Sequence, residues 1–128
     1  MFWQLKLHNN QGASAENRAL KYLSARGMKL IQRNYACKAG EIDLVMLDKE
    51  TLVFVEVRFR SQSQLGSAAE SITISKQNKI RKAAHHFLAC HRKHQHRLCR
   101  FDALLIKNSS THHDANPEKL IEWLQGIF

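Results

Sequence analysis

The apolar positions along the chain follow two different periods, which predicts a mixture of helices and strands. In residues 14–26 and 75–91 they recur every three to four positions, the spacing of a helix with one buried face. Gly27 follows the first segment in the usual place of a helix-ending glycine, and Ser75 is the expected N-cap of the second. Short apolar or alternating runs predict four strands, over residues 28–35, 40–47, 52–60 and 98–106.

The predicted order is therefore α-β-β-β-α-β, a mixed sheet flanked by helices in a single α/β domain over residues 1–128. The last segment of the chain fits either a helix that begins at Pro117 or a fifth strand over residues 120–124. The remaining segments are predicted to be irregular: residues 1–11 as a flexible extension, and residues 61–71 and 107–116 as polar loops.

Three acidic residues interrupt the apolar runs of the second and third predicted strands. Glu41 and Asp43 lie in the sequence GEIDLV, and Glu56 lies in FVEVRFR. Because side chains alternate along a strand, Glu56 shares a face with Arg58, and Asp43 shares a face with Glu41. The polar turn at residues 48–51 makes the two strands antiparallel partners, so Asp43 and Glu56 are expected to lie close together.

A third acid, Glu16, is expected at the same place, because it falls within the apolar stripe of the first helix. Carboxylates that converge repel one another unless a cation neutralises them, and oxygen ligands favour Mg²⁺ or Mn²⁺ over zinc. Such an ion promotes phosphodiester hydrolysis. Taken singly, each acid is better explained structurally, with Glu56 paired to Arg58 and Asp43 capping a bend. Taken together, they favour a metal site.

Charge and length narrow the classes of partner. The chain has 20 Lys and Arg against 11 Asp and Glu, a formal net charge of +9, which favours nucleic acid first and an anionic membrane second. Charge alone fits a role in solubility about equally well. The sequence contains no basic amphipathic segment with exposed aromatic residues, which makes a membrane surface the weaker candidate. The apolar runs are also too short to cross a bilayer. Three cysteines without CxxC spacing, and no secretory signal, fit a reduced, cytoplasmic protein.

Several basic and polar side chains are candidates for contacts with a nucleic-acid backbone. Lys76 opens the second helix, where its side chain either extends toward the acidic site or is solvated. Arg100 and Asp102 share a strand face and are better explained as a structural ion pair. The candidates are Arg33, Lys38, Arg60, Lys76, Gln77, Lys79 and Arg81.

Five histidines gather near the end of the second helix, together with two cysteines. Their spacing matches no zinc-ligand pattern, so a solvated, partly cationic helix end is the favoured explanation. These residues are His85, His86, His91, His94, His96, Cys90 and Cys99.

The chain resembles the YraN-type family of predicted endonucleases, which is distantly similar to archaeal Holliday-junction resolvases within the PD-(D/E)xK nuclease-like superfamily. The resemblance covers nearly the whole chain, with its motifs in family order. They are GASAENRAL around Glu16, RNY at residues 33–35, GEIDLV from Gly40, FVEVRFR from Phe54, SKQNKI from Ser75, RFDAL from Arg100 and the terminal EWLQGIF.

The resemblance implies a restriction-endonuclease-like fold, with Asp43 and Glu56 as metal ligands and Glu16 as an additional ligand. The Lys of the superfamily motif falls on Arg58. Arginine stays protonated, so Arg58 can hold a phosphate or a water but cannot act as a general base. The Pro of the superfamily motif is also absent, since Ile42 precedes Asp43.

We therefore expect a cytoplasmic, Mg²⁺- or Mn²⁺-dependent endonuclease that hydrolyses DNA phosphodiesters, with branched or recombination intermediates as candidate substrates. The rival is a non-catalytic nucleic-acid-binding protein with the same fold, and RNA is a weaker alternative to DNA. Symmetric cutting of two strands would call for a homodimer.

Overall fold

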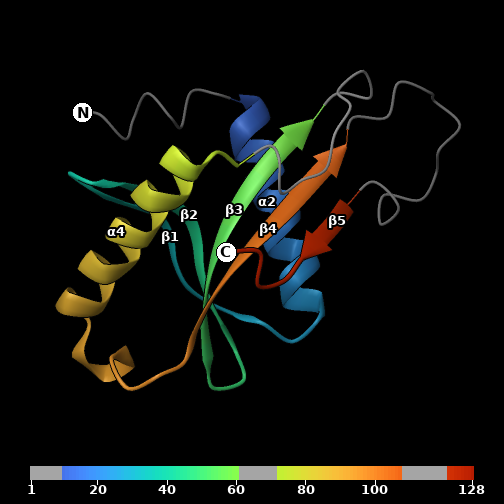
Figure 1. Ribbon diagram of the computed structural model, residues 1–128. Coiled ribbons are helices and arrows are strands. Elements are labelled where there is room, and N and C mark those ends of the chain that lie inside the picture. Colours follow the sequence, from blue (N-terminus) through green and yellow to red (C-terminus); the bar gives the residue numbers. More distant parts are fainter. Residues whose placement is uncertain (1–9, 61–71, 108–120) are drawn as a thin grey trace, which may run out of the picture.

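The computed structural model describes residues 10–60, 72–107 and 121–128. Five strands form one sheet in the order β1-β2-β3-β4-β5 (Figure 1). Neighbouring strands are antiparallel except for β3 and β4, which run parallel and are connected through α4. The elements are α2 (Asn10–Ala25), β1 (Lys29–Cys37), β2 (Gly40–Asp48), β3 (Thr51–Arg60), α4 (Ile74–Cys90), η1 (Arg92–His94), β4 (Cys99–Lys107) and β5 (Ile121–Leu124).

The mixed α/β architecture predicted from the sequence is confirmed, with shifted element ends. Helix α2 begins at Asn10, so it includes the last two residues of the predicted extension. The alternatives for the C-terminal segment resolve in favour of a strand, because β5 pairs with the outer edge of β4. Several predictions fall outside the described residues. They concern the rest of the extension, the loop over 61–71, nearly all of the loop over 107–116, and Pro117.

The predicted N-cap of α4 is wrong by two residues. Thr73 has an extended backbone, and its side-chain Oγ1 accepts a hydrogen bond from the Lys76 backbone N–H at 3.1 Å. Ser75 already lies within the first turn of the helix, where its own backbone is helical. A cap must precede the first helical residue, so Thr73 takes this role.

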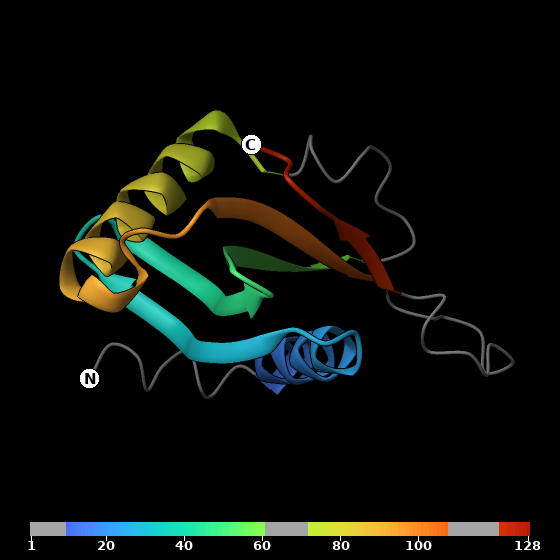
Figure 2. The ribbon, with the colours of Figure 1, turned by 90° about the horizontal axis from the view of Figure 1, so that it is seen from below.

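Helices α2 and α4 cover opposite faces of the sheet (Figure 2). One buried layer joins Ala15, Ala19 and Leu23 of α2 to residues of β2, β3 and β4, and Trp123 of β5 packs against it. The other joins the buried side of α4 to β1, β2 and β3. None of the helices in the described ranges is long and apolar enough to span a membrane. The α4 layer contains Tyr35, Ile42, Val45, Leu52, Phe54, Ile80, Ala83, Ala84 and Phe87.

Strand β1 changes face at Asn34. In a regular strand, Arg33 and Tyr35 would point to the same side of the sheet. Instead the Arg33 guanidinium lies 3.9 Å from Glu16 of α2, whereas the Tyr35 ring packs against Phe87 of α4. Asn34 between them has a φ of +50°, a left-handed conformation that asparagine tolerates better than most residues. This single residue lets two side chains that would share a face in a regular strand reach opposite helices.

Strand β2 changes face at the same level. The register pairs Arg33 with Leu44 and Tyr35 with Ile42, which puts Asp43 across from Asn34. Leu44 packs in the α2 layer, whereas Ile42 packs in the α4 layer. The simple alternation expected from the sequence, with Asp43 on one face beside Glu41, therefore does not hold through Asp43.

Asp102 anchors the C-terminal part of the chain. Its carboxylate is fully buried, at 0% exposure. It accepts hydrogen bonds from Arg100 Nε at 2.9 Å and Nη2 at 3.0 Å, from Trp123 Nε1 at 2.9 Å and from the Gly126 backbone N–H at 2.9 Å. Arg100 also reaches Asp48 at 3.1 Å, and its hydrogen bond to Asp102 raises the pKa of the guanidinium. The predicted structural ion pair between Arg100 and Asp102 is confirmed.

The prediction of a solvated histidine cluster is wrong for two of its members. His94 is only 4% exposed, and its Nδ1 accepts a hydrogen bond from Arg97 Nε at 3.0 Å. The His91 ring stacks on Phe87 with a centroid distance of 3.9 Å. The short helix η1 turns the chain back under α4, and this turn buries side chains that helical periodicity alone would leave in solvent.

Lowering the pH below about 6.5 should destabilise the fold through His94. Burial, and secondarily Arg97, lower the pKa of His94 from its ordinary 6.5. The unfolded chain therefore takes up this proton at a higher pH than the folded chain does. Stability is full above pH 6.5 and falls as the pH drops toward the folded pKa. Urea unfolding between pH 7.5 and 5 measures the effect.

The matched variants are His94→Gln, which removes the titrating group, and His96→Gln, at an exposed position in the same turn. The pH-dependent loss should be smaller in His94→Gln and unchanged in His96→Gln. Equal pH dependence in both variants would contradict this role of His94.

Candidate functional site

Asp43 and Glu56 are neighbours at the point where β2 and β3 stop pairing. The last residues paired across these strands are Leu44 and Val55. One step further, Asp43 Oδ2 accepts a hydrogen bond from the backbone N–H of Val57 at 2.9 Å. The Asp43 carboxylate thus replaces a backbone acceptor at the end of the ladder, directly beside Glu56. The antiparallel hairpin predicted from the sequence brings the two acids together.

All three predicted acids are buried. Their exposed fractions are 5% for Glu16, 9% for Asp43 and 6% for Glu56. Buried carboxylates are costly unless hydrogen bonds or cations compensate for the lost solvation. The contacts around each acid therefore decide what this part of the molecule can do.

Lys76 supplies positive charge to Glu56. Its Nζ lies 3.7 Å from Glu56 Oε1, and the side chain is half-buried. Thr73 fixes the first turn of α4, and Ile80, one turn after Lys76, is buried against the sheet. Of the two alternatives left open by the sequence, the lysine that extends to the acidic site is the one observed. At 3.7 Å the pair is held by charge rather than by a close hydrogen bond.

Glu16 enters from the other face of the sheet. Its Oε1 lies 3.9 Å from Arg33 Nη2, on the side of the sheet that α2 covers. The expected burial of Glu16 is confirmed. Within residues 10–60, 72–107 and 121–128, no three His, Cys, Asp or Glu side chains are grouped as ligands of one metal ion. Glu16 as a third ligand therefore stays a prediction.

Asp43 and Glu56 fit a hard divalent cation by the chemistry of their donors. Both offer carboxylate oxygens, which suit Mg²⁺ and Mn²⁺. Proteins commonly bind Mg²⁺ through one or two carboxylates together with substrate phosphates, rather than through a complete cage of side chains. The donor chemistry of Asp43 and Glu56 fits that pattern, and these are the two residues that would hold such an ion.

The predicted nucleic-acid contacts lie at several different places. Lys38 and Lys79 are exposed, and a Cβ at Gly40 would lie 3.2 Å from the Lys79 carbonyl oxygen, so a larger residue there would crowd the contact between the β1–β2 turn and α4. Arg33 and Gln77 face inward, toward Glu16 and the Ile72 carbonyl. Arg81 lies beside the Phe128 ring. Arg58 is half-buried and lies two residues after Glu56 on β3. The side chain of Arg60 is not among those that the structure describes.

Asn34 of the RNY motif, which the sequence offered only as a backbone contact for DNA, has an unusual conformation beside the acidic site. It lies across from Asp43, and within the described residues its buried Oδ1 has no hydrogen-bond partner. A left-handed non-glycine residue with an unsatisfied oxygen is unusual and marks functional sites in many proteins. The Asn between Arg33 and Tyr35 offered only a weak signal, because asparagine is also common in ordinary turns.

Comparisons with known proteins give a family match. A family model described as "Uncharacterised protein family UPF0102" matches residues 15–106. A UPF0102 protein of Alcanivorax borkumensis is 44% identical over 97% of this chain and 95% of its own length. A UPF0102 protein of Stutzerimonas stutzeri is 43% identical over 93% of this chain and 94% of its own. A UPF0102 protein of Nitrosococcus oceani is 48% identical over 77% of this chain and 80% of its own length.

Proposed function

This chain belongs to the uncharacterised protein family UPF0102, and from its acidic site we propose that it is a metal-dependent endonuclease acting on DNA. The resemblance to the YraN-type family of predicted endonucleases, which implies a restriction-endonuclease-like fold, supports the proposal. The relatives are named only by the family, so the side chains themselves carry the proposal.

The observation that carries the proposal is the trio of Asp43, Glu56 and Lys76. Two buried acids lie on neighbouring strands at the end of a ladder: Asp43 accepts the backbone N–H of Val57, the residue after Glu56, and a lysine ammonium lies 3.7 Å from Glu56. A structural role would be served by any well-packed pair, and buried charges of this kind contribute little net stability. Two acids and a lysine at one point suit the binding of a cation and a phosphate.

Each residue has a distinct task in this proposal. Asp43 and Glu56 hold the cation, which when bound polarises the phosphodiester and lowers the pKa of a water. Lys76 and Arg58 place positive charge beside the phosphate. A guanidinium cannot serve as a general base, so activation of the attacking water would depend on the cation.

The charge of the chain supports a polyanionic substrate. With a formal net charge of +9, and exposed Lys38 and Lys79 near the acidic site, contacts with the backbone of DNA would supply most of the affinity. No base-reading motif is apparent, so the proposal includes little sequence specificity. It also includes a cytoplasmic location and, for cleavage of paired strands, a homodimer.

The experiment is an incubation of purified protein with labelled four-way junction, flap, single-stranded and duplex DNA. Mg²⁺, Mn²⁺ or excess EDTA is added, and the products are separated on denaturing gels. Cleavage is expected with either cation and should be lost in EDTA. Binding of the same DNA, measured at several salt concentrations in EDTA, should weaken steeply as salt increases.

DNA that is bound but never cut would overturn the endonuclease proposal in favour of the non-catalytic binding protein. RNA strands of the same sequence test the alternative substrate. Arg58→Lys is the companion variant: if the arginine limits hydrolysis, the variant should cut faster, and an unchanged rate would remove that explanation.

A further inference from the structure

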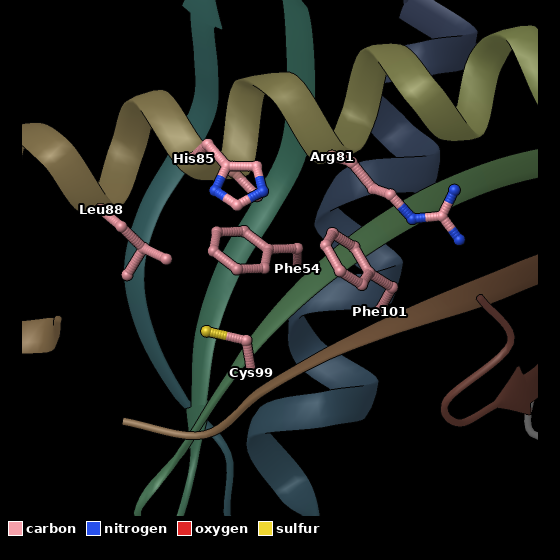
Figure 3. Close-up of a pocket in the computed structure, with 7 residues that line it drawn as sticks. Phe54, Arg81, His85, Leu88, Cys99 and Phe101 are labelled. Atoms are coloured by element: carbon pink, nitrogen blue, oxygen red, sulfur yellow. The ribbon is translucent and has the colours of Figure 1, made fainter. Parts of the chain in front are cut away.

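A pocket of about 210 Å³ lies between α4 and the strands β3 and β4, separate from the carboxylate pair (Figure 3). Leu88, His85 and Arg81 follow one another along α4, opposite the rings of Phe54 and Phe101, and Cys99 lies at the strand side. Ala84 completes the lining. His85 and Cys99 are exposed, so the pocket is accessible from solvent.

Aromatic rings form a continuous stack at this pocket. Phe54 and Phe101 are stacked at 5.4 Å with an interplanar angle of 26°, and Phe101 and Phe128 are stacked at 4.9 Å and 21°. The Arg81 guanidinium carbon lies 5.3 Å from the centroid of the Phe128 ring. Nearly parallel rings with a guanidinium at one end offer a flat, apolar surface for another planar ring system.

The shape and charge of the pocket restrict its ligand. Its volume is smaller than that of pockets for drug-sized molecules, so it suits a single ring system. Among the described residues its lining is almost entirely apolar, and the Arg81 guanidinium is turned toward the Phe128 ring beside the pocket. The complementary ligand is an apolar planar ring whose anionic group lies outside the pocket, within reach of Arg81.

The pocket adjoins the proposed catalytic site along one strand. Phe54 lies two residues before Glu56, and side chains two apart on a strand share a face, about 7 Å from each other. Phe54 packs against α4, and Glu56 is contacted by Lys76 of the same helix. A strand of nucleic acid held at Glu56 could therefore reach this pocket with a neighbouring nucleotide.

We propose that this pocket holds one unpaired nucleobase of the bound strand, stacked beside the phenylalanine rings, with Arg81 contacting its phosphate. The inference rests on the proposed function, because it assigns the substrate class of the same site. A base inside continuous duplex cannot enter the pocket, so strands with unpaired nucleotides, such as flaps, junctions and single strands, are the preferred substrates.

Cys99 lines the pocket, so the reactivity of its thiol should fall when a ligand occupies the pocket. Cys99 is exposed, but partial desolvation of its thiol raises its pKa, so its reaction with N-ethylmaleimide is followed at pH 8.5. A variant with Cys37→Ser and Cys90→Ser leaves Cys99 as the single thiol. Deoxyadenosine monophosphate at millimolar concentration should slow the reaction at least about threefold, whereas deoxyribose 5-phosphate, which lacks the base, should not.

A variant that retains only Cys90, which is exposed on α4 away from the pocket lining, is the matched control and should not be protected. Absence of protection at Cys99, or equal protection by the sugar phosphate, would overturn the proposal.

A second measurement separates this proposal from the endonuclease proposal. Binding of single-stranded and duplex oligonucleotides is measured by fluorescence anisotropy in EDTA, where no cleavage is required. Arg81→Gln should weaken single-strand binding about tenfold and duplex binding much less. Lys82→Gln, at an exposed position on the same helix, should change the affinity for single-stranded and duplex DNA to the same extent. Equal losses on both forms of DNA in Arg81→Gln would reject the pocket, whatever the outcome of the cleavage assay.

Discussion

Metal-dependent cleavage should fall at least about 100-fold when Asp43 is replaced by Asn or Glu56 by Gln. Each amide matches its carboxylate in shape but lacks the negative charge that would hold the cation. In Asp43→Asn the amide carbonyl oxygen can still accept the Val57 N–H, so the end of the β2–β3 ladder should persist. The rate of cutting of the preferred DNA, measured under single-turnover conditions, gives the effect.

Glu41→Gln is the matched control, because Glu41 is a half-buried acid on the same strand, two residues before Asp43. Calorimetric titration with Mn²⁺ provides a readout that does not depend on cutting, and binding should be lost in both site variants and kept in the control. Retained cleavage and Mn²⁺ binding in Asp43→Asn and Glu56→Gln would remove the cation site from these residues.

The free energy of unfolding should decrease by about 3–5 kcal/mol when Asp102 is replaced by alanine. The change removes the acceptor of Arg100, of the Trp123 indole and of the Gly126 backbone N–H, all at a fully buried position. A buried hydrogen-bond donor without an acceptor lowers the stability of the fold far more than a surface ion pair raises it. Urea or guanidinium unfolding, followed by circular dichroism, measures the loss.

Asp48→Asn provides the comparison, because Asp48 bonds the same guanidinium from a partly exposed position. Its cost should stay below about 1 kcal/mol. Asp102→Asn should fall between the two, since an amide oxygen keeps part of the acceptor capacity. Similar losses in Asp102→Ala and Asp48→Asn would show that the buried network contributes little.

Much of the sheet was predictable because its strands have strong local signals. The turn between β2 and β3, and the apolar runs on both sides of it, place Asp43 and Glu56 together before any tertiary information is used. The helix stripe also predicted the burial of Glu16. These features depend on periodicity, which single sequences report well.

Other features depend on contacts between distant segments. The change of face at Asn34 breaks the alternation expected from the sequence, and nothing local distinguishes this asparagine from one in a turn. His94 is buried only because η1 turns back under α4. The aromatic pocket joins three separate parts of the chain, represented by Phe54, Arg81 and Phe101, so no window of sequence could indicate it.

The parallel pairing of β3 with β4 has a consequence for the order of folding. The β1–β2–β3 meander closes through short turns, so the acids of β2 and β3 meet early in a nascent hairpin. The β3–β4 contact requires the whole crossover through α4, a much longer loop closure. Lys76 is carried by that crossover. The acids of β2 and β3 are therefore expected to come together before Lys76, their cationic partner, docks with the crossover.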